Sequence, residues 1–221
     1  MKKTVGVFLG VLLSASVLAF GIGAAEKIDD SFQDLIKGNK RYVDGSCQTI
    51  KAGAEFRTEL SKGQHPHAVI VACSDSRVAP EIVFNQDLGH VFVVRTAGNV
   101  VDAVALGSIE YAVEHLHAPL VVVMGHESCG AVTAAVGSHG DPHGNIGEII
   151  KKILPAVQKA KASLKPNEDV VLKATIENVR LVASDILTKS DVISHEKKEG
   201  KVKVIGVFYS LSKGTVEAVE L

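Results

Sequence analysis

Apolar residues along the chain form several short runs that have the length of β-strands. The runs at residues 68–72 and 120–124 contain no polar residue, which is typical of strands buried on both faces of a parallel sheet. Similar segments at 91–94 and 202–209 predict two more strands. A short segment at 216–219 predicts a final strand, added by a hairpin at one edge of the sheet.

Between these segments, apolar residues recur at helical spacing. This pattern predicts helices at residues 31–38, 56–60, 80–84, 102–116, 130–136, 145–164 and 167–187. Ser31 and Asp102 are predicted N-caps, and Gly38 is a predicted helix end. A polar, glycine-rich loop is expected at 138–144. Strands that alternate with helices in this way predict an α/β fold.

The first 25 residues have the layout of a secretory signal peptide. Lys2 and Lys3 precede an apolar stretch at residues 5–22, and small residues follow up to Ala25. We expect cleavage after Ala25, one mature domain at 26–221, and a periplasmic or secreted protein. The alternative is an uncleaved membrane anchor, because the 18 residues of this stretch are near the shortest length that spans a bilayer.

The composition fits one domain and narrows the range of partners. The chain has 221 residues, 46% of them hydrophobic and 22% charged, which is enough for one sizeable core. The net charge of −1 provides no electrostatic basis for binding nucleic acid or an anionic membrane. Without tryptophan and with 5% aromatic residues, a base-stacking surface is also disfavoured. We therefore expect no nucleic-acid partner, and no membrane association after signal cleavage.

Reactive side chains follow two of the predicted buried strands. Cys73, Asp75 and Arg77 come directly after the first, and His126 and Cys129 come directly after the second. Because parallel strands end at the same edge of a sheet, these side chains are expected to lie together. Two thiolates and one imidazole form a zinc ligand set that leaves a fourth position for water or a carboxylate. Arg77 is expected to pair with Asp75 and to keep it ionised and away from the metal.

The cysteine count leaves a second interpretation open. An exported chain with three widely spaced cysteines, Cys47, Cys73 and Cys129, does not suggest a disulfide framework. A redox pair of Cys73 and Cys129 is an alternative to a zinc site, although the chain contains no Cys-x-x-Cys motif. Cys47 is interpreted as a small hydrophobic residue in an N-terminal loop.

The segments Cys73-Ser74-Asp75-Ser76-Arg77-Val78 and His126-Glu127-Ser128-Cys129-Gly130 resemble motifs of the β-class carbonic anhydrases. Blocks elsewhere in the mature chain are also similar to that family: residues 38–42, 63–66, 92–95, 97–99 and 109–113. The resemblance implies a zinc enzyme that interconverts carbon dioxide and bicarbonate. It also implies a central parallel four-stranded sheet with an added edge strand and helices on both faces. The family further implies a homodimer or tetramer, with N-terminal helices that extend to the dimer partner.

The resemblance assigns roles by position. Cys73, His126 and Cys129 would bind one zinc ion, and Asp75 with Arg77 would form a dyad that accepts a hydrogen bond from the zinc-bound hydroxide. Substrate-side positions, some of them supplied by the second subunit, would be Gln64, Phe92, Ala97, Tyr111 and Gly130. For Gln64 the alternative is a turn residue before a proline. For the pocket residues Phe92, Ala97 and Tyr111, the alternative is core packing.

Some positions differ from patterns in the family. In one branch, the aspartate closes the site by binding zinc at lower pH, and tryptophan and glycine stand three and one residues before the first cysteine. This chain has Ile70 and Ala72 there, so we expect an open site with water as the fourth ligand. Asp87 and His90 also depart from the family pattern. His90 is either a solvated loop residue or a proton carrier.

Three functions remain open besides carbon dioxide hydration. The same fold and zinc site could hydrolyse carbonyl sulfide or carbon disulfide. The protein could instead bind zinc or bicarbonate without catalysis, although the intact Asp75, Arg77 and Gln64 argue against this. The redox pair is the third alternative, which a zinc measurement with a free-thiol count would separate from the others.

Overall fold

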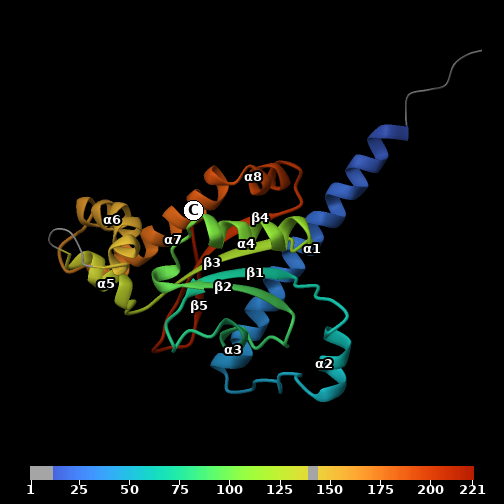
Figure 1. Cartoon of the computed structure of the whole chain (residues 1–221), viewed down its shortest axis with the longest axis horizontal. Helices are drawn as coiled ribbons and strands as arrows, with labels where there is room; N and C mark the ends of the chain where they lie inside the picture. Colours follow the sequence, from blue (N-terminus) through green and yellow to red (C-terminus); the bar gives the residue numbers. More distant parts are fainter. Residues whose placement is uncertain (1–11, 139–143) are drawn as a thin grey trace, which may run out of the picture.

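The structure is a computed structural model that describes residues 12–138 and 144–221, with side-chain environments from residue 23 onward. Its centre is a five-stranded sheet in the order β2-β1-β3-β4-β5 (Figure 1). The strands are β1 (Ala68–Cys73), β2 (Val91–Thr96), β3 (Leu120–His126), β4 (Lys203–Tyr209) and β5 (Val216–Val219). The first four are parallel, and β5 pairs antiparallel with β4. The predicted four-stranded parallel sheet with an added edge strand is confirmed.

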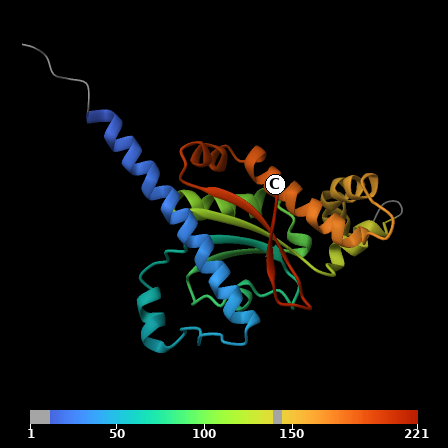
Figure 2. The ribbon, with the colours of Figure 1, turned by 180° about the vertical axis from the view of Figure 1, so that it is seen from behind.

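Helices cover both faces of this sheet. They are α1 (Leu12–Val43), α2 (Ala54–Leu60), α3 (Pro80–Val83), α4 (Ala103–Glu114), α5 (Gly130–Val136), α6 (Ile146–Ala162), α7 (Val170–Lys189) and α8 (Asp191–Lys198), with a 3₁₀ turn at Ala97–Asn99. Apolar residues of α4, α7 and α8 pack on one face, and those of α1 and α3 pack on the other. Seen from behind, α1 crosses that second face (Figure 2).

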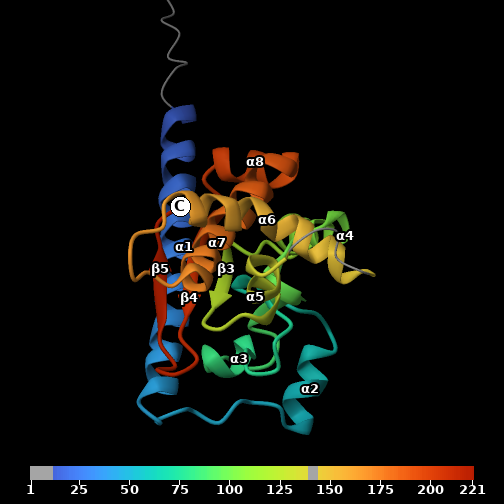
Figure 3. The same cartoon turned by 90° about the vertical axis from the view of Figure 1, so that its left-hand side faces the viewer.

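The strand register brings two reactive segments to one edge of the sheet. All residues of β1 and β3 are buried, as their unbroken apolar sequences predict. Ala72 of β1 pairs with Met124 of β3, so Cys73 and His126 both lie at the carboxyl ends of neighbouring strands. Helices α5 and α6 lie beyond this end of the sheet and come forward in the side view (Figure 3).

The predicted limits of the N-terminal helix are wrong. Helix α1 continues through both Ser31 and Gly38, and Ser31 Oγ donates a hydrogen bond to the Lys27 carbonyl oxygen inside the helix. Gly38 serves a packing purpose, since a Cβ atom there would lie 1.7 Å from the carbonyl oxygen of Phe84. The glycine therefore permits α1 to approach the end of α3 instead of ending the helix.

The C-terminal half shows a second difference from the prediction. Helix α7 continues to Lys189, and a further helix, α8, follows at once with Ser190 as its N-cap. The Ser190 hydroxyl accepts from the Ile193 N–H and donates to the Glu110 carboxylate of α4. This second contact joins residues 80 positions apart, so sequence periodicity contained no sign of it.

The expected signal peptide is only partly described by the structure. Residues 1–11 lie outside the described part, and residues 12–25 form the start of α1, which projects away from the sheet. Among the described residues, no helix combines the length and apolarity needed to cross a membrane. The predicted loop at 138–144 also lies mostly outside the described residues.

Candidate metal centre

Three side chains with metal-binding atoms meet at the carboxyl edge of the sheet. Cys73 is the last residue of β1, His126 is the last residue of β3, and Cys129 directly precedes α5. One potential ligand atom from each lies within 4.8 Å of the others. All three residues are buried, against an apolar cluster that includes Val132 and Ile153. The predicted convergence of two thiols and one imidazole is present in the fold.

The turn after β3 places Cys129 beside the other two residues. Ser128 has a φ of 54°, in the left-handed region, so the chain reverses within the two residues between His126 and Cys129. The Glu127 carboxylate accepts hydrogen bonds from Ser210 and Ser212. The hydrogen bond from the Ser212 backbone N–H is the largest cause of the lowered pKa of Glu127. These hydrogen bonds connect the turn after β3 to the loop that follows β4.

The imidazole of His126 has one nitrogen that is free to bind a ligand. Its Nδ1 lies 2.9 Å from the carbonyl oxygen of Glu127, and because a carbonyl only accepts, Nδ1 carries the proton. The other nitrogen, Nε2, is buried and has no hydrogen-bond partner among the described residues. A buried polar atom without a partner costs free energy unless it binds something. A metal ion would satisfy this atom, and a hydrogen bond from the other ring nitrogen to a backbone carbonyl is typical of metal-bound histidine.

The two thiols shift each other's pKa in opposite directions. A hydrogen bond from Cys129 is the largest cause that lowers the pKa of Cys73 to about 4, and the hydrogen bond from the Gly98 N–H contributes further. The same contact with the Cys73 thiolate, together with burial, raises the pKa of Cys129. Thiolate is the form that binds metals, and a divalent cation would displace the remaining proton.

Asp75 is held beside the cluster by Arg77. The arginine donates from its backbone N–H and Nε to Oδ1, each at 2.9 Å, and from Nη2 to Oδ2 at 2.7 Å. Hydrogen bonding from Arg77 is the main reason that the pKa of Asp75 lies far below its usual range. Asp75 Oδ2 is 3.9 Å from His126 Nε2, too far for a direct hydrogen bond. The predicted pair is therefore present, with one carboxylate oxygen near the metal-binding atoms.

Two contacts that position the backbone near the cluster were not predicted from the sequence. Arg95 of β2 donates to the carbonyl oxygens of Cys73 at 2.9 Å and Asp75 at 2.7 Å, which fixes the loop between them. The Gly98 N–H donates to Cys73 Sγ at 3.2 Å. Both residues stand in blocks that resemble the family, but only the fold shows what these blocks contact.

The proposed substrate-side residues fall into two groups: one lies next to the cluster, and the other lies distant from it. Ala97 follows Thr96, the β2 partner of Cys73, and Gly130 follows Cys129, so both lie next to the cluster. Phe92 pairs with Val69, four residues before Cys73 and therefore about 13 Å away along the strand.

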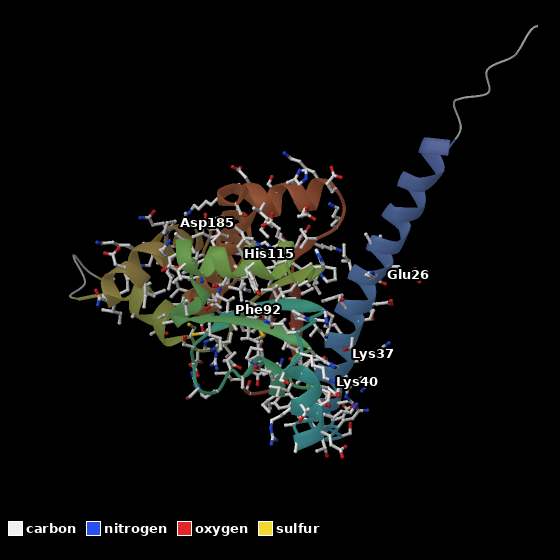
Figure 4. All side chains as sticks on the ribbon, turned by 45° about the vertical axis from the view of Figure 1, so that its right-hand side comes forward. Glu26, Lys37, Lys40, Phe92, His115 and Asp185 are labelled. Carbon is white, nitrogen blue, oxygen red and sulfur yellow. The ribbon has the colours of Figure 1, made fainter. Side chains whose placement is uncertain are left out.

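Gln64 and Tyr111 belong to the distant group. Gln64 is exposed in the loop that precedes β1. The ring of Tyr111 lies 6.4 Å from that of Phe92 and 5.4 Å from that of His115, and Figure 4 shows Phe92 on β2 with His115 nearby. Within one protomer, these residues do not reach the metal centre.

The two residues that depart from the family pattern are also away from the cluster. Asp87 accepts a hydrogen bond from the Lys51 backbone at 2.8 Å, so it anchors the loop before α2. His90 is exposed, directly before the amino end of β2, and its ring lies 6.0 Å from that of His67. Neither residue contacts the metal-binding side chains of its own protomer.

Two sulfurs and one nitrogen, buried and adjacent to an ionised carboxylate, suit zinc with one position left for a reacting ligand. A mostly parallel sheet between helices, with this candidate metal site at its carboxyl edge, defines the class as an α/β protein with a buried Cys-His-Cys cluster. The family model described as Carbonic anhydrase matches residues 68–216. Carbonic anhydrase 2 of Mycobacterium tuberculosis is 40% identical over 188 residues, covering 83% of this chain and 89% of the relative.

Solved structures agree with this assignment. The β-carbonic anhydrase of Coccomyxa, in complex with acetazolamide, superposes with a TM-score of 0.69 at 28% identity, covering 75% of this chain and 77% of that one. A tetrameric β-carbonic anhydrase of Sordaria macrospora gives a TM-score of 0.68 at 26% identity, with coverages of 76% and 87%. The chain belongs to the carbonic anhydrase family, in its β class.

Proposed function

We propose that this protein is a zinc-dependent enzyme that interconverts carbon dioxide and bicarbonate. The observation that carries the proposal is the buried Cys73, His126 and Cys129 cluster with the ionised Asp75 beside it, in a chain of the carbonic anhydrase family. The unpartnered Nε2 of His126 and the lowered pKa of Cys73 fit a bound dication.

Some residues of the site would bind the metal ion, and others would orient the attacking oxygen. Cys73, His126 and Cys129 would hold the ion, which when bound supplies a water molecule that ionises near neutral pH. Asp75 would accept a hydrogen bond from the attacking oxygen and so orient it toward the carbon of carbon dioxide. Arg77 keeps that carboxylate ionised and fixed. The apolar side chains around the cluster limit the access of other water molecules.

We infer that the site is open, with the fourth position available to water. Arg77 donates hydrogen bonds to both oxygens of Asp75, and these bonds favour its present position over a direct bond to zinc. Ile70 and Ala72 stand where the closing branch of the family has tryptophan and glycine. A crystal structure of the zinc form at neutral pH tests this inference, and an Asp75-zinc bond would contradict it.

We infer that the functional unit is a homodimer or a tetramer built from such dimers. Gln64, Phe92 and Tyr111 lie away from the metal centre of their own protomer, so a substrate-side role requires a second copy. Strand β2 is a half-exposed edge of the sheet, and Tyr111 is 47% exposed. Light scattering of the purified protein measures the assembly.

We propose that residues 1–25 direct export and are then removed, which makes the mature protein periplasmic or secreted. The charged, apolar and small-residue segments in that order support this. Glu26, which Figure 4 shows on α1, would become the first residue. Intact-mass measurement of protein from the exporting host tests the cleavage, and a mature chain that retains residues 1–25 would contradict it.

Carbon dioxide hydration by the purified mature protein is the decisive assay, with Asp75→Ala as its paired variant. We expect the wild type to be active and the variant to retain zinc but lose roughly 10²-fold or more of its rate, since it lacks the orienting acceptor. An inactive, zinc-loaded wild type would support the non-catalytic binding function. Carbonyl sulfide and carbon disulfide, assayed with the same preparation, test the alternative substrates.

A further inference from the structure

Asn178 of α7 is a fully buried polar residue, and the residues one helical turn before and after it, Ala174 and Val182, are buried and apolar. Among the described residues, the side chain makes one hydrogen bond, from Nδ2 to the carbonyl oxygen of Gly98 at 2.9 Å. Its Oδ1 is buried without a partner. Because a half-satisfied buried amide costs free energy, packing alone does not explain an asparagine at this position.

Gly98 connects this amide to the metal centre. Its carbonyl oxygen accepts from Asn178, and its N–H donates to Cys73 Sγ at 3.2 Å. Its φ of 66° lies in the left-handed region, which glycine adopts readily. A Cβ atom at this position would lie 2.7 Å from Ile153 Cδ1 and 3.0 Å from Ala131 Cβ, so both backbone conformation and space require glycine here.

A glycine with this role must be held by its surroundings, because it has many accessible conformations. The N–H of Gly98 reaches the Cys73 sulfur only if the peptide keeps its orientation. A hydrogen bond donated to a thiolate stabilises negative charge on sulfur, and such outer contacts orient a ligand and tune the metal that it binds. Asn178 holds Gly98 at its carbonyl oxygen, whereas the contact with the sulfur is made by its N–H.

We propose that Asn178 is a positioning residue for the zinc centre. Its amide holds Gly98 in the conformation that directs the Gly98 N–H to Cys73 Sγ, and it thereby influences how strongly that sulfur binds the ion. This inference rests on the proposed zinc site. It adds a contribution from α7, a helix that supplies none of the three ligands.

The test compares wild type with Asn178→Leu, which keeps the branched shape of the side chain but removes its hydrogen-bonding atoms, and with Asn178→Ala. Thr175→Val is the matched control, since Thr175 is a buried polar residue on the same helix, and within the described part of the chain its hydroxyl bonds only to the Val171 carbonyl oxygen of that helix. Three quantities are measured: zinc affinity by competition with a chromophoric chelator, the thiolate-to-metal charge-transfer absorption of the cobalt-substituted protein, and the thermal unfolding midpoint.

We expect both Asn178 variants to raise the zinc dissociation constant by about 10-fold or more and to shift the charge-transfer band. Thr175→Val should retain the wild-type affinity and spectrum even where its unfolding midpoint falls. This separates an effect on the metal ligand from a general loss of stability. Alanine is smaller than asparagine and introduces no clash, so Asn178→Ala provides the measurement if the leucine variant does not fold.

Two outcomes would overturn the inference and are distinguishable from each other. If wild type binds zinc and cobalt, and the Asn178 variants match it in affinity and spectrum, the asparagine has no positioning role and the proposed function stands. If wild type binds neither metal, the zinc site itself is wrong and both proposals fail.

Discussion

The imidazole of His126 and the carboxylate of Asp75 are each held in one orientation by a neighbouring group. The Glu127 carbonyl fixes Nδ1 of the imidazole, which leaves Nε2 for a metal. Arg77 fixes both oxygens of Asp75 and keeps the carboxylate ionised. The residues that would bind the metal are therefore different from those that orient other groups at the site. Substitutions should affect metal binding and the rate of reaction separately.

The first residue-scale prediction concerns the cysteines. Cys73→Ser should reduce zinc content well below one ion per chain, because a hydroxyl is a poor substitute for thiolate as a zinc ligand. The variant should also lose the stabilisation that bound metal provides, about 4 kcal/mol when free zinc is 1,000 times the dissociation constant. Elemental analysis and calorimetry measure these effects.

Cys47→Ser is the control for this prediction, since Cys47 is exposed and lies outside the cluster. It should retain full zinc content and the wild-type unfolding midpoint. A Cys73→Ser protein that keeps one zinc per chain would show that the cluster is not the metal site.

The second residue-scale prediction concerns pH. Arg77 lowers the folded-state pKa of Asp75, so the stabilisation that this pair provides is present above the unfolded-state pKa of about 3.9. It is lost as the pH falls from there toward the folded-state pKa. In urea unfolding with a chelator present, the difference in stability between wild type and Arg77→Gln should be larger at pH 6 than at pH 3.

Arg57→Gln is the control for the pH experiment. Arg57 donates to the Ala52 carbonyl oxygen, which does not titrate, so its effect on stability should not change over this range. An Arg77→Gln effect that is equal at both pH values would mean that the pair does not depress the pKa of Asp75.

At the scale of elements, α1 is joined to two segments distant in sequence by the side chain of Asn39. Its Nδ2 donates to the carbonyl oxygens of Val83 and Gly214, and its Oδ1 accepts from the Val216 N–H. One buried amide thus links α1 to α3 and to the β4-β5 hairpin. Together with the close approach at Gly38, this contact explains why the segment that resembles the family at 38–42 matters for the fold.

Asn39→Ala should lower the free energy of unfolding by about 2–3 kcal/mol, because it leaves buried backbone groups without partners. Lys40→Ala is the matched control at the next position of the same helix. The Lys40 side chain is 74% exposed and pairs with Asp44, and Figure 4 shows it pointing away from the sheet. Its loss should cost about 0.5 kcal/mol or less. Equal effects in chemical denaturation would contradict the linking role of Asn39.

At the scale of the whole molecule, the metal ligands and two of the proposed substrate-side residues, Gln64 and Phe92, lie at opposite ends of the sheet. Cys73 and His126 are at the carboxyl ends of their strands, whereas Gln64 precedes β1 and Phe92 is near the start of β2. If Gln64 contributes to catalysis, it must do so in the site of a partner protomer.

Mixed dimers test this arrangement. A protomer carrying Gln64→Ala is co-assembled with one carrying Asp75→Ala. If Gln64 acts across the interface, one site of the mixed dimer contains both substitutions and the other contains neither, so about half of wild-type activity should return. If each protomer completes its own site, every site carries one substitution and activity stays low. The two parent homodimers, measured in parallel, provide the baseline.

The sheet and the reactive cluster were predictable because each depends on local patterns. Unbroken apolar runs identified β1 and β3, and Cys73, His126 and Cys129 follow those runs directly. The helix limits at Ser31 and Gly38 were wrong because both residues act through contacts, one with Lys27 in a longer helix and the other with Phe84. Ordinary N-cap and glycine signals do not reveal such contacts.

The sequence by itself determined the strand pattern, the family and the residues available for chemistry, since the alternation of apolar runs and polar strand ends is encoded over a few neighbouring positions. Only the tertiary structure decided how those residues are held. The contacts of Arg95 with Cys73, of Asn178 with Gly98 and of Asn39 with Gly214 join residues 22, 80 and 175 positions apart. Hydrogen bonds at such separations depend on how the elements pack in space, which no local pattern specifies.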